Sequence, residues 1–184
     1  MAEQVGFTLW FTGLSGAGKT TIALAVEKEL RARGLKVERL DGDTVRQSLT
    51  RDLGFSKEDR DRNIERVTFV AKLLSRNGVA VLASFISPYR ETRAMVRRET
   101  TNFIEVFVNA PLEVCVARDV KGMYAKAFRG EIKDFTGVSD PYEEPLNPEI
   151  TLNTHLETVE ESLAKCLTYL EEHGYILVVE VENA

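Results

Sequence analysis

The chain has 184 residues, of which 43% are hydrophobic, and its formal net charge is −5 at pH 7. This length fits one α/β domain with a continuous core, so we expect residues 1–184 to form a single domain. The negative charge argues against a nucleic-acid partner, because a phosphate backbone requires a broad basic surface. No apolar run approaches the roughly 20 residues of a membrane span, so no membrane partner is expected.

Two further features bear on the compartment. Cys115 and Cys166 lie far apart in sequence and form no CxxC pair, which favours two reduced core thiols. The opening residues 1–4 have neither the basic region nor the long apolar region of a signal peptide. We therefore expect a cytoplasmic protein.

The first elements alternate between strands and helices, which predicts a three-layer α/β/α fold with a mainly parallel sheet. A strand is predicted over 7–11, followed by a glycine-rich turn and a helix over about 19–33 that ends before Gly34. A second strand over 36–40 leads into the acidic turn Asp41-Gly42-Asp43.

The next helix is predicted to begin at Ser56, which is followed by acidic residues that favour a helix N-terminus, and to end at Gly78. Its expected core face is Ile64, Val67, Ala71 and Leu74. Buried strands are predicted over 79–83 and 103–108, and a terminal strand over 175–181. The stripe of the last helix is Leu156, Val159, Leu163, Cys166 and Leu170.

The segment over about 122–148 departs from this alternation, since it is rich in glycine, proline and charge and has little apolar periodicity. A loop of this length in a compact domain is usually functional or disordered. We predict that it forms a mobile lid.

Residues 13–20 match the P-loop pattern GxxxxGK[ST] in full, between a predicted strand and a predicted helix. Glycines allow backbone N–H groups to surround a phosphate, Lys19 would pair with the β- and γ-phosphates, and the Thr20 hydroxyl would hold Mg²⁺. The expected ATP-binding residues are Gly13, Leu14, Ser15, Gly16, Ala17, Gly18, Lys19, Thr20 and Thr21. The motif alone does not separate a kinase from a switch or a motor.

The acidic turn helps to separate these classes. The chain has no NKxD motif of a GTPase, and the strand over 79–83 leads into Ser84 and Phe85 rather than into a carboxylate. Asp41, at a strand end on the phosphate side of the sheet, is placed to contact Mg²⁺ or to accept a proton from an attacking hydroxyl. The alternative is a turn with Asp43 as helix cap. Together with a lid that excludes water, the turn favours a small-molecule kinase.

A cluster of polar and aromatic residues follows the acidic turn and points to the acceptor. Arginine grips phosphate or sulfate through paired N–H bonds, and a phenylalanine ring can stack on a base. For any single arginine, a solvated helix face is the alternative. As a group, these residues indicate an anionic, nucleotide-like acceptor. They are Arg46, Phe55, Arg60, Asn63 and Arg66.

From about Gly6 to Gly174 the chain resembles the adenylylsulfate kinase family. The specific motifs lie at residues 39–43, 53–56, 60–64, 84–88, 118–124, 130–137 and 140–143. The resemblance implies that MgATP phosphorylates the 3′-hydroxyl of adenosine 5′-phosphosulfate in sulfate activation. It also implies that the protein is a homodimer.

The resemblance implies a role for each matching position. Phe55 and Phe135 would sandwich the acceptor adenine, while Arg118 would lie near the ATP base. Lys121 and Lys133 would close over the phosphates and the acceptor. The remaining acceptor residues are Asp41, Asp43, Arg46, Arg60, Asn63, Ile86 and Ser87.

Ser87 is often described in the family as a phosphoryl-accepting residue, and its alternatives are a turn before Pro88 or a helix cap. Direct in-line transfer between two bound nucleotides requires no covalent intermediate, so Ser87 is expected in the site without that step. Two other functions stay open at this point. One is a kinase for gluconate, shikimate or a nucleoside monophosphate, and the other is a regulatory module that binds nucleotide without turnover.

Overall fold

The computed structural model describes residues 4–178, and its centre is a five-stranded sheet in the order β2-β3-β1-β4-β5. All four neighbouring pairs are parallel. Parallel strands bring their carboxyl ends to one edge, where ligands bind in such sheets. The strands are β1 (Phe7–Thr12), β2 (Val37–Asp41), β3 (Ala80–Ser84), β4 (Phe103–Asn109) and β5 (Ile150–Asn153).

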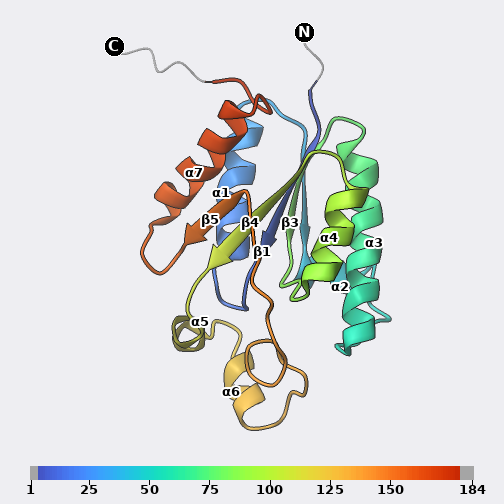
Figure 1. Cartoon of the computed structure of the whole chain (residues 1–184), viewed down its shortest axis with the longest axis vertical. Helices are drawn as coiled ribbons and strands as arrows, with labels where there is room; N and C mark the ends of the chain where they lie inside the picture. The colour runs from blue at the N-terminus through green and yellow to red at the C-terminus, as the bar shows by residue number, and fades with distance from the viewer. Residues whose placement is uncertain (1–3, 179–184) are drawn as a thin grey trace.

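Helices cover both faces of this sheet, which confirms the predicted three-layer fold (Figure 1). The helices α1 (Lys19–Ala32) and α7 (Val159–Glu172) pack together on one face. On the other face lie α3 (Lys57–Ser75) and α4 (Arg90–Glu99). Three short helices lie near the carboxyl ends of the strands, and they are α2 (Gly42–Gln47), α5 (Leu112–Arg118) and α6 (Met123–Phe128).

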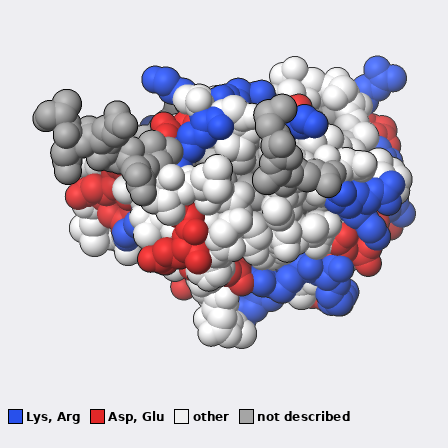
Figure 2. Space-filling model, turned by 90° about the horizontal axis from the view of Figure 1, so that it is seen from above, with Lys and Arg blue, Asp and Glu red and all other residues white. Residues whose placement is uncertain are grey.

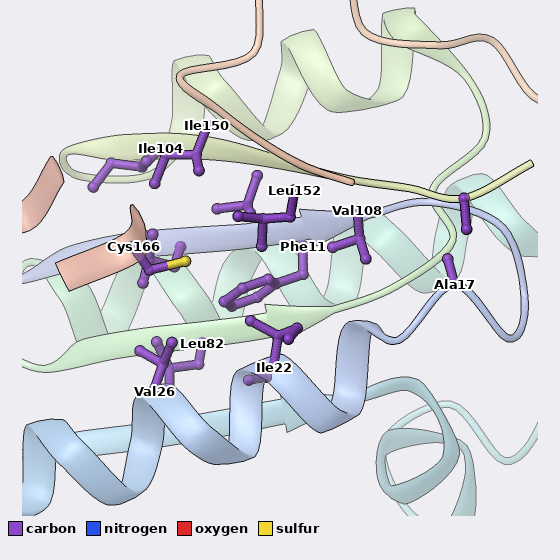
Figure 3. Packing of buried hydrophobic residues seen from close by; sticks show 14 of the residues in the cluster. Phe11, Ala17, Ile22, Val26, Leu82, Ile104, Val108, Ile150, Leu152 and Cys166 are labelled. Carbon is purple, nitrogen blue, oxygen red and sulfur yellow. The ribbon is translucent and has the colours of Figure 1, made fainter. Parts of the chain in front are cut away.

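Two apolar clusters, one on each face, hold the layers together. The larger cluster joins the sheet to α1 and α7, with Phe11, Leu82, Val26 and Cys166 packed between them (Figure 3). Trp10 belongs to the other cluster, under α3 and α4, because successive side chains of a strand point to opposite faces. Cys166 and Cys115 are buried free thiols, as expected.

Most predicted elements are confirmed, with boundaries shifted by one to three residues. Ser56 is the N-cap of α3, where its hydroxyl accepts the Asp59 N–H at 3.1 Å. On the predicted core face of α3, Ile64, Val67 and Ala71 are buried, whereas Leu74 is half-buried.

Two predictions near the C-terminus are wrong. Of the terminal strand predicted over 175–181, residues 175–178 form no strand, and 179–181 lie outside the described residues. The fifth strand of the sheet is instead Ile150–Asn153, which follows the lid. Leu156 is 77% exposed and precedes α7, because the helix begins only after Thr158, whose capping box with Glu161 satisfies the first backbone N–H groups.

The predicted lid, residues 122–148, contains the helix α6. After α6 it runs past the carboxyl ends of the strands towards β5 (Figure 1). On the face seen in Figure 2, basic side chains are interspersed with acidic ones. Within residues 4–178, no helix is long and apolar enough to cross a membrane.

Candidate active site

The P-loop connects β1 to α1 and has the backbone that its glycines permit. Gly13, Gly16 and Gly18 have positive φ angles of 152°, 76° and 107°. At Gly13 a Cβ atom would lie 2.3 Å from the Val108 carbonyl oxygen, so no larger residue fits there. The loop is therefore shaped by glycine at the positions where it turns most tightly, and α1 directs its N-terminus into it.

Lys19 lies across the mouth of this loop. Its Nζ donates to the carbonyl oxygens of Gly13 at 2.9 Å and Leu14 at 2.8 Å. Burial of the ammonium lowers the pKa of Lys19 to about 8. An anion in the loop would offer the ammonium a better partner than these neutral carbonyls, so Lys19 is poised to exchange them for phosphate oxygens.

Thr20 and Asp41 meet beside the loop, although 21 residues separate them. The Thr20 hydroxyl donates to Asp41 Oδ2 at 2.8 Å, and Asp41 is only 6% exposed. The other carboxylate oxygen, Oδ1, accepts the Asp43 N–H at 3.0 Å and so caps α2. The alternative assignment of Asp43 as the cap is therefore wrong. Asp43 is exposed instead, and its carboxylate pairs with Lys121 from the segment that enters the lid.

This pair fits a magnesium ion. A hydroxyl oxygen and a carboxylate oxygen, 2.8 Å apart and beside the phosphate loop, are ligands of the hard type that Mg²⁺ takes together with nucleotide phosphates and water. The chemistry of the donors therefore agrees with the predicted metal role of Thr20 and Asp41, which stays a prediction.

Arg118 reaches the P-loop from the end of α5. Its guanidinium donates to the Gly16 carbonyl oxygen at 3.1 Å and to the Thr154 carbonyl oxygen at 2.8 Å. Thr154, which follows β5, also donates its hydroxyl to the Ala17 carbonyl oxygen at 2.6 Å. Thr154 was missed because no motif marks it. Arg118 thus lies beside the P-loop, and its position near the ATP base stays a prediction. Thr21 is exposed on α1.

Two of the predicted acceptor residues, Arg46 and Phe55, are stacked on each other. The Arg46 guanidinium carbon lies 4.3 Å from the centre of the Phe55 ring. The same side chain donates to the Gly54 carbonyl oxygen at 3.1 Å. Phe55 is 59% exposed, so it is not a core residue and one of its faces is available to a ligand.

Arg60 ties α3 to the lid. It donates to Asp140 Oδ2 at 2.5 Å, to the Thr136 hydroxyl at 3.1 Å and to the Asp134 carbonyl oxygen. Tyr89 donates to the same oxygen of Asp140 at 2.8 Å. An internal carboxylate therefore occupies the arginine that was predicted to hold an anionic acceptor. Asp140 lies in one of the family motifs and Tyr89 directly follows another, but their pairing across 51 residues has no local signal.

Two other predicted acceptor residues are engaged within the protein. Asn63 is buried and accepts the Thr50 hydroxyl at 2.7 Å. Phe135, which was expected to cover the acceptor adenine, is only 9% exposed and packs edge-on against Tyr124, with ring centroids 5.1 Å apart. Phe135 and Phe55 therefore do not form an open sandwich in this conformation. Lys133 is exposed on the lid.

Ser87 lies in a buried network behind the P-loop. Its Oγ accepts the Trp10 indole N–H at 3.0 Å and donates to Thr12 Oγ1 at 3.2 Å. The Thr12 hydroxyl donates its one hydrogen to the Ile86 carbonyl oxygen at 2.7 Å. It can therefore only accept from the Tyr142 hydroxyl, which lies 2.9 Å away and is the donor of that bond. Ser87 is 3% exposed. It contributes to the packing of the strand end and is poorly placed to attack a phosphate.

A cavity of about 580 Å³ lies between the start of the P-loop and the lid. Among the described residues, its lining includes Leu14, residues 109–112, residues 137–142 and Glu144. None of the predicted acceptor residues lines it, and its charged groups are carboxylates, so it does not suit an anionic acceptor in this conformation.

The comparisons with known proteins agree with this geometry. The sequence model of the family described as adenylylsulphate kinase matches residues 5–153. A probable adenylyl-sulfate kinase from Pseudomonas aeruginosa is 71% identical over 175 residues, which are 95% of this chain and 81% of that protein.

Two solved structures are also similar. The Mycobacterium tuberculosis APS kinase CysC in complex with AMPPNP and APS has a TM-score of 0.88 and 44% identity, over 91% of this chain and 99% of that chain. A hexameric APS kinase from Thiobacillus denitrificans has a TM-score of 0.72 and 37% identity, over 95% of this chain and 30% of that chain. From the family match and the close relative, we conclude that this chain belongs to the adenylylsulphate kinase family.

Proposed function

We propose that the protein transfers the γ-phosphoryl group of MgATP to the 3′-hydroxyl of adenosine 5′-phosphosulfate, giving 3′-phosphoadenosine 5′-phosphosulfate and ADP. The observation that carries this proposal is the P-loop with its Thr20–Asp41 pair in a chain 44% identical to an APS kinase that binds AMPPNP and APS. The exposed Phe55 ring and the arginine stacked on it support a purine acceptor.

On the ATP side, the P-loop N–H groups and Lys19 hold the phosphates, and Lys19 leaves the Gly13 and Leu14 carbonyl oxygens to do so. When bound, Mg²⁺ neutralises charge on the phosphates, and Thr20 and Asp41 hold it there. Asp41 also orients the acceptor hydroxyl. Phosphoryl transfer of this kind depends mainly on positioning and on charge stabilisation.

On the acceptor side, the lid rearranges as the acceptor binds. Arg60 exchanges the Asp140 carboxylate for the phosphosulfate, and Phe135 leaves Tyr124 to cover the adenine opposite Phe55. Asn63, Ile86 and the backbone of Ser87 complete the site, with Arg46 and Asp43 beside it. Lys133 approaches the transferred group from the lid, and Lys121 approaches it from the segment that enters the lid. Closure of this kind excludes water from the γ-phosphoryl group.

A panel of acceptors tests this proposal against the other kinases. ADP release is measured with MgATP and, in turn, adenosine 5′-phosphosulfate, gluconate, shikimate and a nucleoside monophosphate. We expect ADP release to depend on adenosine 5′-phosphosulfate alone. Release with gluconate or shikimate would contradict the proposal, and tight nucleotide binding without any transfer would favour a regulatory module instead.

We further propose a homodimeric, cytoplasmic enzyme in which residues 1–184 form a single domain. The family resemblance supports a dimer, whereas the relative from Thiobacillus denitrificans is a hexamer. Light scattering coupled to gel filtration separates the two, since the chain mass is 20.7 kDa. A hexameric mass would contradict the dimer.

A further inference from the structure

A buried arginine outside the motifs considered so far connects the two sides of the acceptor site. Arg93, on α4, is only 2% exposed. Its Nε donates to Glu105 Oε1 on β4 at 2.8 Å, so the buried guanidinium is neutralised by a carboxylate. Burying two charges costs desolvation free energy, which can exceed the attraction between them. The presence of this pair is therefore weak evidence that it serves only to stabilise the fold.

The other two nitrogens of Arg93 hold the backbone. Nη1 donates to the Ser87 carbonyl oxygen at 2.6 Å, and Nη2 donates to the Glu143 carbonyl oxygen at 2.6 Å. One rigid fork thus joins the end of β3 to the segment by which the lid returns to the sheet. A lysine cannot reproduce this arrangement, because its ammonium is a point charge without the planar fork.

The backbone that Arg93 holds is strained. Ser87 has a φ angle of +40°, a conformation that non-glycine residues rarely adopt. Such a conformation persists only where the surroundings fix it, and it is typical of functional sites. The Arg93 hydrogen bond to the carbonyl group of Ser87 itself supplies part of that fixation.

Further hydrogen bonds hold the lid return, the residues 142–144 by which the lid approaches the sheet, against the segment that follows β3. The Glu143 N–H donates to the Pro88 carbonyl oxygen at 2.9 Å, and the Glu143 carboxylate accepts the Arg90 N–H at 2.8 Å. Tyr142, next to it, donates to Thr12 at the start of the P-loop. The lid is thus anchored at residues 142–144, and the part that carries Phe135 lies before this anchor.

We propose that Arg93 is a positioning residue: it fixes the backbone of Ser87 and the lid return at Glu143 to each other, and so shapes the acceptor site without touching the acceptor. This inference rests on the proposed function. Loss of the fork disturbs Ile86, Ser87 and the lid, whereas the P-loop keeps its glycine-shaped backbone. The Michaelis constant of the acceptor therefore rises, and that of ATP does not.

The test compares Arg93→Lys with Arg97→Lys. Arg97 lies on the same helix and pairs with Glu105 and Glu149, away from residues 87 and 143. For R93K we expect a rise of about tenfold in KM for adenosine 5′-phosphosulfate, the scale of one charge-assisted hydrogen bond, with KM for ATP unchanged. For R97K we expect both constants unchanged. An R93K enzyme with an unchanged acceptor KM, or with the same changes as R97K, would overturn the inference.

A second variant keeps the test decisive if R93K does not fold. The double variant R93M/E105Q removes the fork and the charge of its partner together, so no unpaired carboxylate is left buried. The same rise in the acceptor KM is expected, and its absence overturns the inference. The wild-type protein in the same assay separates the two proposals: failure to form product refutes the proposed function, whereas unchanged variants of an active enzyme refute only the role of Arg93.

Discussion

Replacing Asp41 by asparagine and by alanine separates its role in capping α2 from its proposed role in catalysis. Asp41 Oδ1 caps the helix and Oδ2 accepts the Thr20 hydroxyl. Asparagine is as good an N-cap as aspartate, so Asp41→Asn keeps the cap through its amide oxygen. It removes the charge, and it replaces the oxygen that accepts the Thr20 hydroxyl by an NH2 group. Arg39, whose guanidinium lies 3.5 Å from Asp41, keeps its partner Glu27 at 3.0 Å.

The magnitudes follow from these contacts. Loss of the cap in Asp41→Ala costs about 1 kcal/mol of unfolding free energy, which for a chain of this size lowers the melting temperature by roughly 2–4 °C. Asp41→Asn should leave the melting temperature close to that of the wild type. Both variants should lose about two orders of magnitude or more in kcat, because each lacks the carboxylate that, in the proposed mechanism, holds the metal and orients the hydroxyl.

The assay measures kcat with saturating MgATP and acceptor, together with thermal unfolding followed by circular dichroism. An Asp41→Asn enzyme that turned over at the wild-type rate would refute the catalytic role and leave Asp41 as a helix cap. A large fall in the melting temperature of Asp41→Asn would refute the assignment of the cap.

Three other predictions concern residues whose roles the structure separates. Burial lowers the pKa of Lys19 from its ordinary 10.5 to about 8. Between these two pH values the unfolded chain binds more protons than the folded chain. The free energy of unfolding of the nucleotide-free protein should therefore rise with pH between about 8 and 10.5. Denaturant titrations at several pH values should show this rise in the wild type, and Lys19→Met should lack it; equal rises would contradict the assignment. Ser87→Ala should keep turnover and lose about 1–3 kcal/mol of unfolding free energy, because the Trp10 N–H is left buried without its acceptor. Complete loss of turnover with intact binding of both nucleotides would instead favour a covalent step. Phe55→Ala should raise the acceptor KM with little change in melting temperature, because Phe55 is exposed. Phe135→Ala should raise the acceptor KM and also destabilise the fold by about 3 kcal/mol, because Phe135 is buried. Equal melting temperatures of the two variants would show that Phe135 is not packed in the core.

The parts of the fold that could be predicted from the sequence depend on local chemistry. The P-loop is a contiguous motif with glycines at its turning points, and the Ser56 cap and the stripe of α3 follow from residues a few positions apart. The fifth strand was missed because it has only four residues, of which Ile150 and Leu152 are buried. So short an alternation is not distinct from a loop in sequence.

The parts of the site that could not be predicted depend on contacts between distant residues. The burial of Phe135 depends on Tyr124 across the lid, and the engagement of Arg60 by Asp140 spans 80 residues. The fork of Arg93 joins two carbonyl groups, which have no side-chain signature in a sequence. Residue types indicated the chemistry of the acceptor site, but only the tertiary structure gives the partners that its residues hold before a ligand binds.

The most direct test of the proposed reaction follows the phosphoryl group itself. The protein is incubated with ATP labelled in the γ-phosphoryl group, Mg²⁺ and adenosine 5′-phosphosulfate, and the nucleotide product is isolated and treated with a phosphatase specific for 3′-phosphates. We predict that all transferred label is found in 3′-phosphoadenosine 5′-phosphosulfate and is released by this treatment, with one ADP formed for each product. Label found only as inorganic phosphate, or at another position of the acceptor, would contradict the transfer of a phosphoryl group to the 3′-hydroxyl.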